Sequence, residues 1–268
     1  MSSANRTTEV VVCLKWVFQA DEPSDARFAG MSPADHAALE LALQWATHIG
    51  GQVTAITVGP AQADAVLREA LACGATRAVR IDTANGVSSA DVASAIASVA
   101  RHAAWVWCGD YSIDNGSGSV PGYLAAALQA SQALGVLGVT FESGSIVATR
   151  RVDGGRREVL DVQAPAVISV EGATARLRRA SLTAMRAAAS APIEVVAPSI
   201  VMRTSEHIAH TYRPRARALA SPTGAEALDR VRSLTAAGTS SAAHEVETLE
   251  PADAAARIVQ TLREWGYL

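Results

Sequence analysis

The chain has 268 residues, 49% of them hydrophobic, and a formal net charge of −3 at pH 7. This length allows one large domain with an additional arm, and a charge so close to zero gives no support for nucleic-acid binding. Cys13, Cys73 and Cys108 lie far apart, without the spacing of metal ligands, so we expect buried, reduced thiols. The sequence has neither a signal peptide nor a long apolar run, and we therefore expect a cytoplasmic protein without membrane insertion.

Residues 9–141 alternate between short Val-rich segments and longer Ala- and Leu-rich segments with helical spacing. The Val-rich segments are apolar throughout, which is typical of strands buried on both faces of a parallel sheet. The predicted strands are Glu9–Phe18, Val53–Val58, Thr76–Ile81, Ala103–Cys108 and Leu137–Phe141. The predicted helices are Pro33–Ile49, Ala61–Cys73, Ser88–Arg101 and Val120–Leu134. The alternation predicts an α/β fold with a doubly wound, mostly parallel sheet, Rossmann-like and similar to adenine nucleotide alpha-hydrolases.

The pattern changes after residue 141. Two extended segments, Ser145–Val152 and Arg157–Val162, flank a hairpin turn at residues 153–155. A strand over Ala166–Val170 follows, and we expect these three segments to form an antiparallel addition to the sheet. Next come a short basic segment, Arg176–Ala189, and an extended piece, Pro192–Val196.

The composition along the chain predicts four parts. Residues 1–8 are expected to be a disordered start, and residues 9–196 an α/β nucleotide-binding domain. Residues 197–244 are rich in Ser, Thr, Ala and Arg without strong periodicity, which predicts an extended arm that wraps a partner subunit. Residues 245–268 are expected to form a strand over Val246–Leu249 and a helix opened by Pro251.

The polar loop from Gly109 to Gly122 links the fourth predicted strand to the next helix. Its Gly, Ser, Asn and Asp residues favour a tight turn with exposed backbone. A strand, a turn and a helix in this order place backbone N–H groups at a helix N-terminus, which binds anions. In a parallel sheet, ligands bind outside the carboxyl ends of the strands. The loop therefore predicts a phosphate cradle for a nucleotide, with an ordinary surface loop as the alternative.

Catalytic motifs are absent from the sequence. There is no Walker A lysine loop, no GxGxxG after the first strand, no CxxC, no HExxH and no nucleophile elbow. Asp110 and Asp114 could act as acid and base, but no nucleophile pair stands beside them. A nucleotide site without catalytic groups indicates a binder or carrier.

Three stretches resemble the beta subunit of electron transfer flavoprotein. Met31-Ser32-Pro33-Ala34-Asp35 is similar to the family's Asn-Pro-Phe-Asp signature, with Ser32 in place of Asn and Ala34 in place of Phe. Residues 58–75 resemble its Gly-Pro…Leu-Arg-x-Ala-Leu-Ala-Met-Gly-Ala run. The loop from Gly109 resembles its Gly-Lys-Gln-x-Ile-Asp-Asp segment, with Asp110-Tyr111 in place of Lys-Gln. The resemblance covers about residues 9–200.

This resemblance implies an electron-carrier subunit without substrate chemistry of its own. Members pair with an alpha subunit that holds FAD, shuttle electrons from flavin-dependent dehydrogenases to a membrane or soluble acceptor, and bind a structural AMP in the beta subunit. Seven positions match the AMP site: Ser32, Ala34, Asp114, Ser117, Gly118, Ser119 and Val120. Leu182 matches a leucine that docks on partner dehydrogenases, and Arg179 and Arg186 flank it as a steering rim.

Two other readings remain open at this stage. The first is a bifurcating member of the family, in which a second FAD takes the place of AMP. The second is a nucleotide-binding regulatory module without a redox role, which predicts a homo-oligomer with ATP or AMP and no flavin. The long arm over residues 197–244 favours a subunit with a partner over this last alternative.

Overall fold

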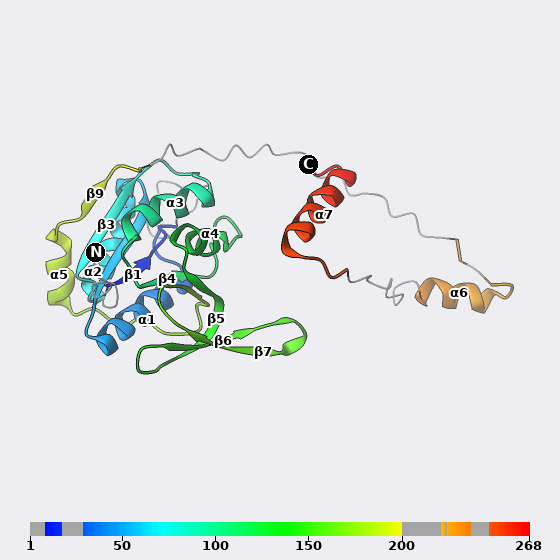
Figure 1. Cartoon of the computed structure of the whole chain (residues 1–268), viewed down its shortest axis with the longest axis horizontal. Coiled ribbons are helices and arrows are strands. Elements are labelled where there is room, and N and C mark those ends of the chain that lie inside the picture. The colour runs from blue at the N-terminus through cyan, green and yellow to red at the C-terminus, as the bar shows by residue number, and fades with distance from the viewer. Residues whose placement is uncertain (1–8, 18–28, 200–220, 223, 237–246) are drawn as a thin grey trace. The chain divides into compact units, whose positions relative to one another are not determined.

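The structure is a computed structural model, and it describes residues 9–17, 29–199, 221–222, 224–236 and 247–268. The chain divides into two compact units, Met1–His207 and Ile208–Leu268. The predicted disordered start at residues 1–8 lies outside the described residues. The first unit contains the whole nine-stranded sheet (Figure 1).

The described residues form nine strands and seven α-helices. The strands are β1 Glu9–Cys13, β2 Gln52–Gly59, β3 Arg77–Asp82, β4 Trp105–Gly109, β5 Ser131–Phe141, β6 Ile146–Arg151, β7 Arg157–Val162, β8 Ala166–Val170 and β9 Glu194–Val196. The helices are α1 Pro33–Ile49, α2 Asp64–Cys73, α3 Ser89–Ala100, α4 Ser119–Leu128, α5 Leu182–Ser190, α6 Ala227–Ala236 and α7 Pro251–Glu264. Two 3₁₀ turns, Ala61–Ala63 and Asp153–Gly155, complete the set.

All nine strands belong to one sheet with the order β7-β6-β5-β8-β4-β1-β2-β3-β9. In this spatial order, the seven strands β5-β8-β4-β1-β2-β3-β9 are all parallel to their neighbours. Strands β6 and β7 add an antiparallel hairpin beside β5, at one edge of the sheet. The chain moves outward from β1 through β2 to β3 and then returns to place β4 on the other side of β1. This reversal makes the β1–β4 boundary the topological switch point. The predicted doubly wound α/β fold is confirmed.

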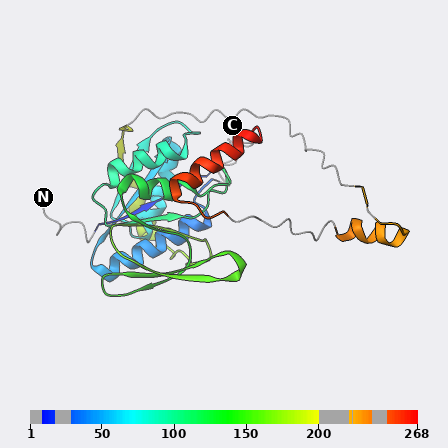
Figure 2. The same cartoon turned by 45° about the vertical axis from the view of Figure 1, so that its right-hand side comes forward.

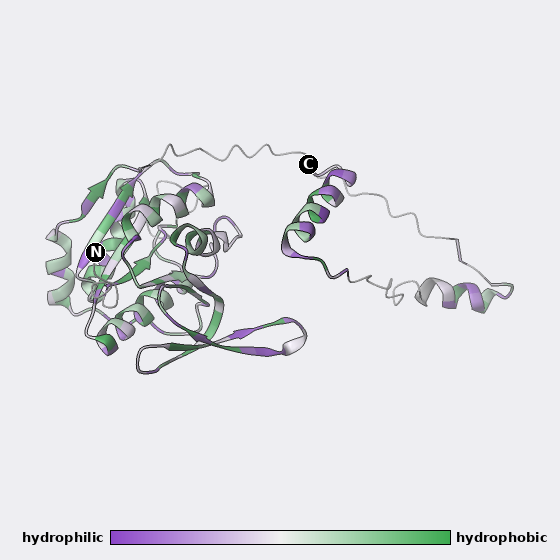
Figure 3. Ribbon diagram, in the orientation of Figure 1, coloured by the Kyte–Doolittle hydropathy of each residue, from purple (hydrophilic) through white to green (hydrophobic). Residues whose placement is uncertain are grey.

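Helices cover both faces of the parallel strands (Figure 2). One core cluster joins α1 and α2 to the sheet, and its Leu39, Trp45 and Leu67 side chains are fully buried. The other joins α3 and α4 to the opposite face through Ile96 and Leu124. The central strands are hydrophobic along their length, whereas the β6–β7 hairpin carries hydrophilic residues between hydrophobic ones (Figure 3). The difference arises because the hairpin exposes alternate residues of β7 to solvent.

Helix α1 begins and ends as the sequence predicts. The Ser32 side chain accepts a hydrogen bond from the backbone N–H of Asp35 at 3.1 Å, and Pro33 occupies the first helical position. Gly50 ends the helix with φ at 64°, a left-handed conformation that glycine adopts without strain. The Ser32 cap holds the first turn of α1 in place, and the candidate site depends on that turn.

The helix predicted over Val120–Leu134 is wrong in its second half. Helix α4 ends at Leu128, and Gln129 has a left-handed φ of 51°. Residues from Ser131 onward form β5, which pairs in parallel with β8, Ser131 opposite Ala166. The predicted strand Leu137–Phe141 is therefore only the second half of β5. The gain from sheet pairing outweighs the helical preference of this Ala- and Leu-rich stretch.

The segment Ala166–Val170, predicted as part of an antiparallel addition, is β8 and lies inside the sheet. It pairs in parallel with β4 on one side and β5 on the other. All five of its residues are buried, as expected of a parallel strand covered on both faces. The antiparallel addition is confirmed for β6 and β7 only.

Smaller differences concern the ends of the chain. The first strand stops at Cys13 and does not extend toward Phe18, which itself lies outside the described residues. Helix α6 occupies residues 227–236, where no element was predicted. Residues 247–250 are irregular, so the described part of the predicted strand Val246–Leu249 does not form one. The predicted helix from Pro251 is confirmed as α7.

Candidate nucleotide site and docking face

A cavity of about 340 Å³ lies at the switch point, beyond the carboxyl ends of β1 and β4. We call it the nucleotide cavity. Its walls come from the segments that follow three strands, residues 13–17 after β1, 83–87 after β3 and 108–118 after β4. The first turns of α1, α3 and α4 close it, through Asp35, Ser89 and Val120 among others. The predicted position of a ligand site in a parallel sheet is thus the position of this cavity.

The loop after β4 is held by its own backbone. Ser112 and Ser117 form a bridge in which the Ser112 N–H donates to the Ser117 carbonyl at 2.8 Å. The Gly116 N–H donates back to the Ser112 carbonyl at 2.8 Å. A Cβ atom on Gly118 would lie 2.0 Å from the Asp110 carbonyl oxygen, so only glycine fits there. Helix α4 starts at the next residue without a side-chain cap, which leaves its first N–H groups for an anion.

Lys15 brings a positive charge to this loop. Its Nζ donates to Ser112 Oγ and to Asp114 Oδ1, both at 2.7 Å. Burial raises the pKa of Asp114, but the hydrogen bonds from Lys15 and Ser112 outweigh it and hold the pKa below its ordinary value. The sequence analysis missed Lys15. The available signal was a charged residue inside the apolar run Glu9–Phe18; β1 ends at Cys13, so Lys15 lies two residues beyond its carboxyl end.

Asp35 is a buried acid at the cavity wall, only 7% exposed. The Ser32 hydroxyl donates to Asp35 Oδ2 at 3.1 Å, and the backbone N–H of Lys15 lies 3.4 Å from the same oxygen. Burial is the dominant influence and raises the pKa of Asp35 to about 6, against the lowering effect of these hydrogen bonds. A Cβ atom on Gly109 would lie 2.8 Å from Asp35 Oδ1. The first turn of α1 therefore packs directly on the end of β4.

The structure brings five of the seven predicted nucleotide residues together in the wall of the cavity. These are Ser32, Asp114, Ser117, Gly118 and Val120. The other two, Ala34 and Ser119, are not among the lining residues. Ala34 is 7% exposed and packs against the backbone of Gly109, whereas Ser119 is the exposed first residue of α4. Besides Lys15 and Asp35, the sequence analysis missed Val58 and residues 83–87, because these come from other strand ends.

Asp110 and Asp114, considered above as an acid–base pair, lie in different surroundings. Asp110 is not among the residues that line the cavity, and burial followed by the charge of Glu171 raises its pKa. Asp114 is committed to Lys15 and Ser112. The described residues contain no group of three or more His, Cys, Asp or Glu side chains able to hold a metal ion.

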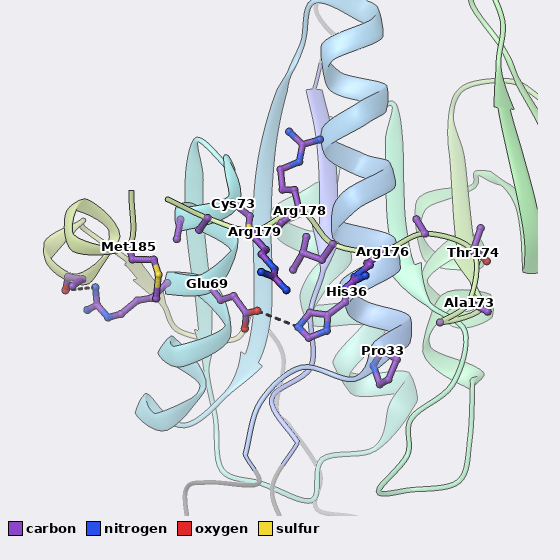
Figure 4. Close-up of a pocket in the computed structure, with 17 residues that line it drawn as sticks. Pro33, His36, Glu69, Cys73, Ala173, Thr174, Arg176, Arg178, Arg179 and Met185 are labelled. Atoms are coloured by element: carbon purple, nitrogen blue, oxygen red, sulfur yellow. Dashed lines mark hydrogen bonds and ion pairs between the residues drawn. The ribbon is translucent and has the colours of Figure 1, made fainter. Parts of the chain in front are cut away.

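A second, larger hollow of about 1140 Å³ lies on the other side of the first turn of α1. We call it the docking groove. It is lined by Pro33 and His36 of α1, by α2 residues including Glu69, by residues 172–180 and by Met185 of α5 (Figure 4). His36 Nε2 lies 3.1 Å from Glu69 Oε1. This contact raises the pKa of His36 more than burial lowers it.

Two arginine contacts hold the docking groove together. Arg178 forms a two-pronged hydrogen bond with Glu40 of α1, Nε to Oε2 and Nη2 to Oε1, both at 2.9 Å. Although burial raises the pKa of Glu40, the hydrogen bonds from Arg178 and Gln44 outweigh it and lower the pKa. Arg68 of α2 donates to the carbonyls of Ala188 and Ala189 at 2.9 and 2.7 Å, which satisfies the C-terminal end of α5.

Helix α5 presents the predicted docking residues to solvent. Leu182 is 72% exposed and Met185 is 55% exposed. Arg179 and Arg186 are exposed on either side of Leu182 in the chain. Ala188 is the buried residue of α5, and the helix packs against α2. An exposed leucine at the start of an anchored helix is a suitable protein contact.

A known protein family matches the part of the chain that forms most of these sites. The model of the electron transfer flavoprotein domain family matches residues 25–201, which is more than half of the chain. The chain belongs to the electron transfer flavoprotein family. The match includes the first turn of α1, the loop after β4 and α5, and so covers most of both candidate sites.

Several curated members of the electron transfer flavoprotein family are similar to this chain. The beta subunit of electron transfer flavoprotein from Thermoanaerobacterium thermosaccharolyticum is 32% identical over 52% of this chain and 55% of its own length. Protein FixA from Sinorhizobium fredii is 34% identical over 60% of each chain. The electron transfer subunit gamma of acryloyl-CoA reductase from Anaerotignum propionicum is 32% identical over 52% of this chain and 54% of its own length. The chain thus spans little more than half the length of these relatives.

No helix among the residues described is long and apolar enough to cross a membrane.

Proposed function

We propose that this chain is the beta subunit of a heterodimeric electron transfer flavoprotein, with AMP in the nucleotide cavity. It would carry electrons, with its alpha partner, from flavin-dependent dehydrogenases to a membrane or soluble acceptor. The observation that carries the proposal is the polar cavity at the β1–β4 switch point, walled by the Gly118 turn and the start of α4. The names of the relatives support the same role for this member of the family.

The cavity has the chemistry that AMP requires. The uncapped N–H groups at the start of α4 suit a phosphate, and the turn at Gly118 admits the close approach of an anion to the backbone. Lys15 supplies a cation beside them. A volume of about 340 Å³ is near the lower end of the usual range of ligand cavities, about 300–1,000 Å³. That size favours a mononucleotide over a second FAD.

The docking groove and α5 supply the second half of the proposal. FAD is held mainly by the alpha subunit, and Leu182 docks on flavin-dependent dehydrogenases with Arg179 and Arg186 at its rim. The support is the exposure of Leu182 on a helix that Arg68 anchors at its other end. An apolar anchor surrounded by charge is typical of protein interfaces. The arm over residues 197–244 as a wrap around the alpha subunit, and the cytoplasmic location, stay predictions.

Co-expression with a candidate alpha subunit tests the proposed function. The purified pair should show a flavin spectrum, and denaturation should release one FAD and one AMP per heterodimer. Two FAD molecules without AMP would instead support a bifurcating subunit. A colourless homo-oligomer that carries ATP would refute the electron-transfer role.

A charge variant and its control test whether Lys15 lies beside the phosphate of AMP. Lys15→Gln keeps a polar side chain, one atom shorter, but removes the cation, so AMP should be lost or depleted while FAD remains. Lys15 is partly exposed, at 38% of its side chain, so the fold should tolerate this change. Arg156→Gln alters an exposed cation in the β6–β7 turn and should leave both nucleotides unchanged. Full AMP occupancy in Lys15→Gln would contradict the assignment.

A further inference from the structure

Two cysteines face each other at the floor of the nucleotide cavity. Cys13 is the last residue of β1, and Cys108 precedes the last residue of β4. They are direct partners in the parallel pairing of these two strands. Both side chains belong to the same core cluster, on the α3 and α4 face of the sheet. Both also line the cavity, although they are only 8% and 3% exposed.

The geometry of this pair is compatible with a disulfide. Neighbouring strands lie about 4.8 Å apart, and the Cα atoms of bridged cysteines usually lie about 4.4–6.8 Å apart. In-register partners of parallel strands point to the same face, so their sulfurs are adjacent. The neighbouring Cys13 thiol, followed by burial, raises the pKa of the Cys108 thiol well above its ordinary value.

Cys73 provides the contrast within the same chain. It ends α2 on the opposite face of the sheet, and its thiol donates to the Arg178 carbonyl at 3.6 Å. Burial raises the pKa of Cys73 as it does that of Cys108, so the pKa does not set the two apart. It has no cysteine neighbour in its core cluster. The three buried thiols therefore divide into a facing pair at a cavity and a single structural cysteine.

We propose that Cys13 and Cys108 form a reversible disulfide, with the nucleotide cavity as the entry path for a small oxidant such as hydrogen peroxide. The Cys13 sulfur, the more exposed of the two, attacks one peroxide oxygen as a thiolate. The O–O bond breaks, and a sulfenic acid and one water are formed. The Cys108 sulfur then attacks the sulfenic sulfur, the S–O bond breaks, and a second water leaves. Two thiols lose two electrons and one peroxide becomes two waters.

A ligand in the cavity should control this reaction. Cys13 and Cys108 line the same cavity as Ser32 and Val120, so an occupant of the cavity covers the path to the two sulfurs. This part of the inference rests on the proposed function, because it assumes that AMP is the occupant. The disulfide itself does not depend on the identity of the ligand.

Thiol counting on the full-length chain tests the disulfide. The reduced native protein is treated with hydrogen peroxide, quenched, unfolded and alkylated, and its mass is measured. We expect the reduced chain to alkylate at three cysteines and the oxidised chain at one, with a linked peptide pair that contains Cys13 and Cys108. Dithiothreitol should restore all three. Three alkylated cysteines after treatment, a link that includes Cys73 or a link between chains would overturn the proposal.

Matched variants separate the facing pair from Cys73. Cys73→Ser should still form the disulfide. Cys108→Ser should stop at the sulfenic acid of Cys13 and gain one oxygen, whereas Cys13→Ser lacks the attacking thiol and should keep its mass over the same time. Circular dichroism of each variant confirms that it is folded. Should Cys13→Ser fail to fold, the linked peptide pair in the wild type still decides the question.

Nucleotide protection is measured on the same wild-type protein. Saturating AMP should slow disulfide formation at least about tenfold, because the bound ligand prevents peroxide from reaching the two sulfurs. An unchanged rate with bound AMP confirmed by calorimetry would overturn the shielding. If AMP does not bind at all, the proposed function fails, but the disulfide is still expected to form at its original rate.

Discussion

The nucleotide cavity and the docking groove lie on opposite sides of one helical turn and are built in different ways. At the start of α1, Ser32 and Asp35 face the cavity, whereas Pro33 and His36 line the groove. The cavity is made of strand ends, glycine turns and helix starts. The groove is made of side chains on α2, α5 and residues 172–180, which Arg68 and Arg178 connect to the core.

This difference has a consequence for substitutions. At the cavity, backbone and buried groups define the shape, so a change there affects binding and folding together. At the docking groove, exposed side chains can be replaced with little effect on folding, except for the arginines that hold the segment. Four predictions test this division, in order of decreasing expected effect.

The largest effect is expected for Asp35→Asn as a function of pH. The pKa of Asp35 is about 6 in the folded chain and 3.8 in its ordinary state. Between these values the folded chain holds a proton that the unfolded chain has released, so the stability of the wild type falls as pH rises. The free energy of unfolding of the wild type relative to Asp35→Asn should fall by about 3 kcal/mol across the whole titration, of which about 2 kcal/mol is lost between pH 3.8 and 6.

Urea unfolding at a series of pH values measures this difference. Below the window both states of the chain hold the proton, and above it both have lost it, so the difference should be flat on either side. Asp253→Asn, at an exposed acid in the first turn of α7, is the control and should show no comparable step. A difference that does not vary between pH 3.8 and 6 would show that Asp35 titrates normally.

The second prediction concerns the turn at Gly118. Gly118→Ala places a Cβ atom 2.0 Å from the Asp110 carbonyl, and the backbone must move to accommodate it. The AMP affinity of the heterodimer should fall about a hundredfold, or roughly 2.7 kcal/mol, because the start of α4 moves with the loop. Isothermal titration calorimetry measures it. Gly138→Ala is the control, since a Cβ atom there would meet nothing within 4 Å.

The third prediction separates docking from folding. Leu182→Ala should weaken binding to the partner dehydrogenase by about 2 kcal/mol, or roughly 30-fold. Its free energy of unfolding should change by less than about 0.5 kcal/mol, because the side chain is 72% exposed. Surface plasmon resonance and urea unfolding give the two values. Val159→Ala, at an exposed valine of β7, should change neither, and equal losses in docking for both variants would remove α5 as the contact.

The smallest effect is expected for Arg178→Ala. Its loss leaves the buried Glu40 carboxylate with only the Gln44 hydrogen bond from a side chain. We expect about 1.5 kcal/mol of destabilisation, reduced from the value for a buried pair because the Arg178 side chain is 43% exposed. Arg179→Ala changes the next, exposed arginine and should leave the unfolding free energy unaltered. Identical unfolding curves for both variants would mean that Arg178 does not hold the segment.

Local patterns in the sequence were sufficient for most elements of the fold. The Val-rich strands and the capped helix α1 are confirmed within a few residues, because burial on both faces and a Ser-Pro start leave clear local signals. The loop after β4 was predicted as part of a ligand site for a similar reason. Its small polar residues precede a helix, and that order alone specifies exposed N–H groups.

Other features depended on contacts between distant residues. The Ser131–Leu134 stretch has helical composition and became strand because β8, more than thirty residues later, offers it a pairing edge. Strand β8 itself lies inside the sheet between β5 and β4, and not in the predicted antiparallel addition. Lys15 and Asp35 belong to the candidate site because β1 lies beside β4 and α1 packs on Gly109. No local pattern contains these neighbours.

The sequence by itself therefore determined the α/β alternation, the caps and the kind of loop that follows β4. Each of these depends on the preferences of a few consecutive residues. Only the tertiary structure decided which strand ends meet, that Cys13 lies opposite Cys108, and that one turn of α1 separates the nucleotide cavity from the docking groove. Those facts follow from the order and register of the sheet, which are set by the packing of residues far apart in the chain.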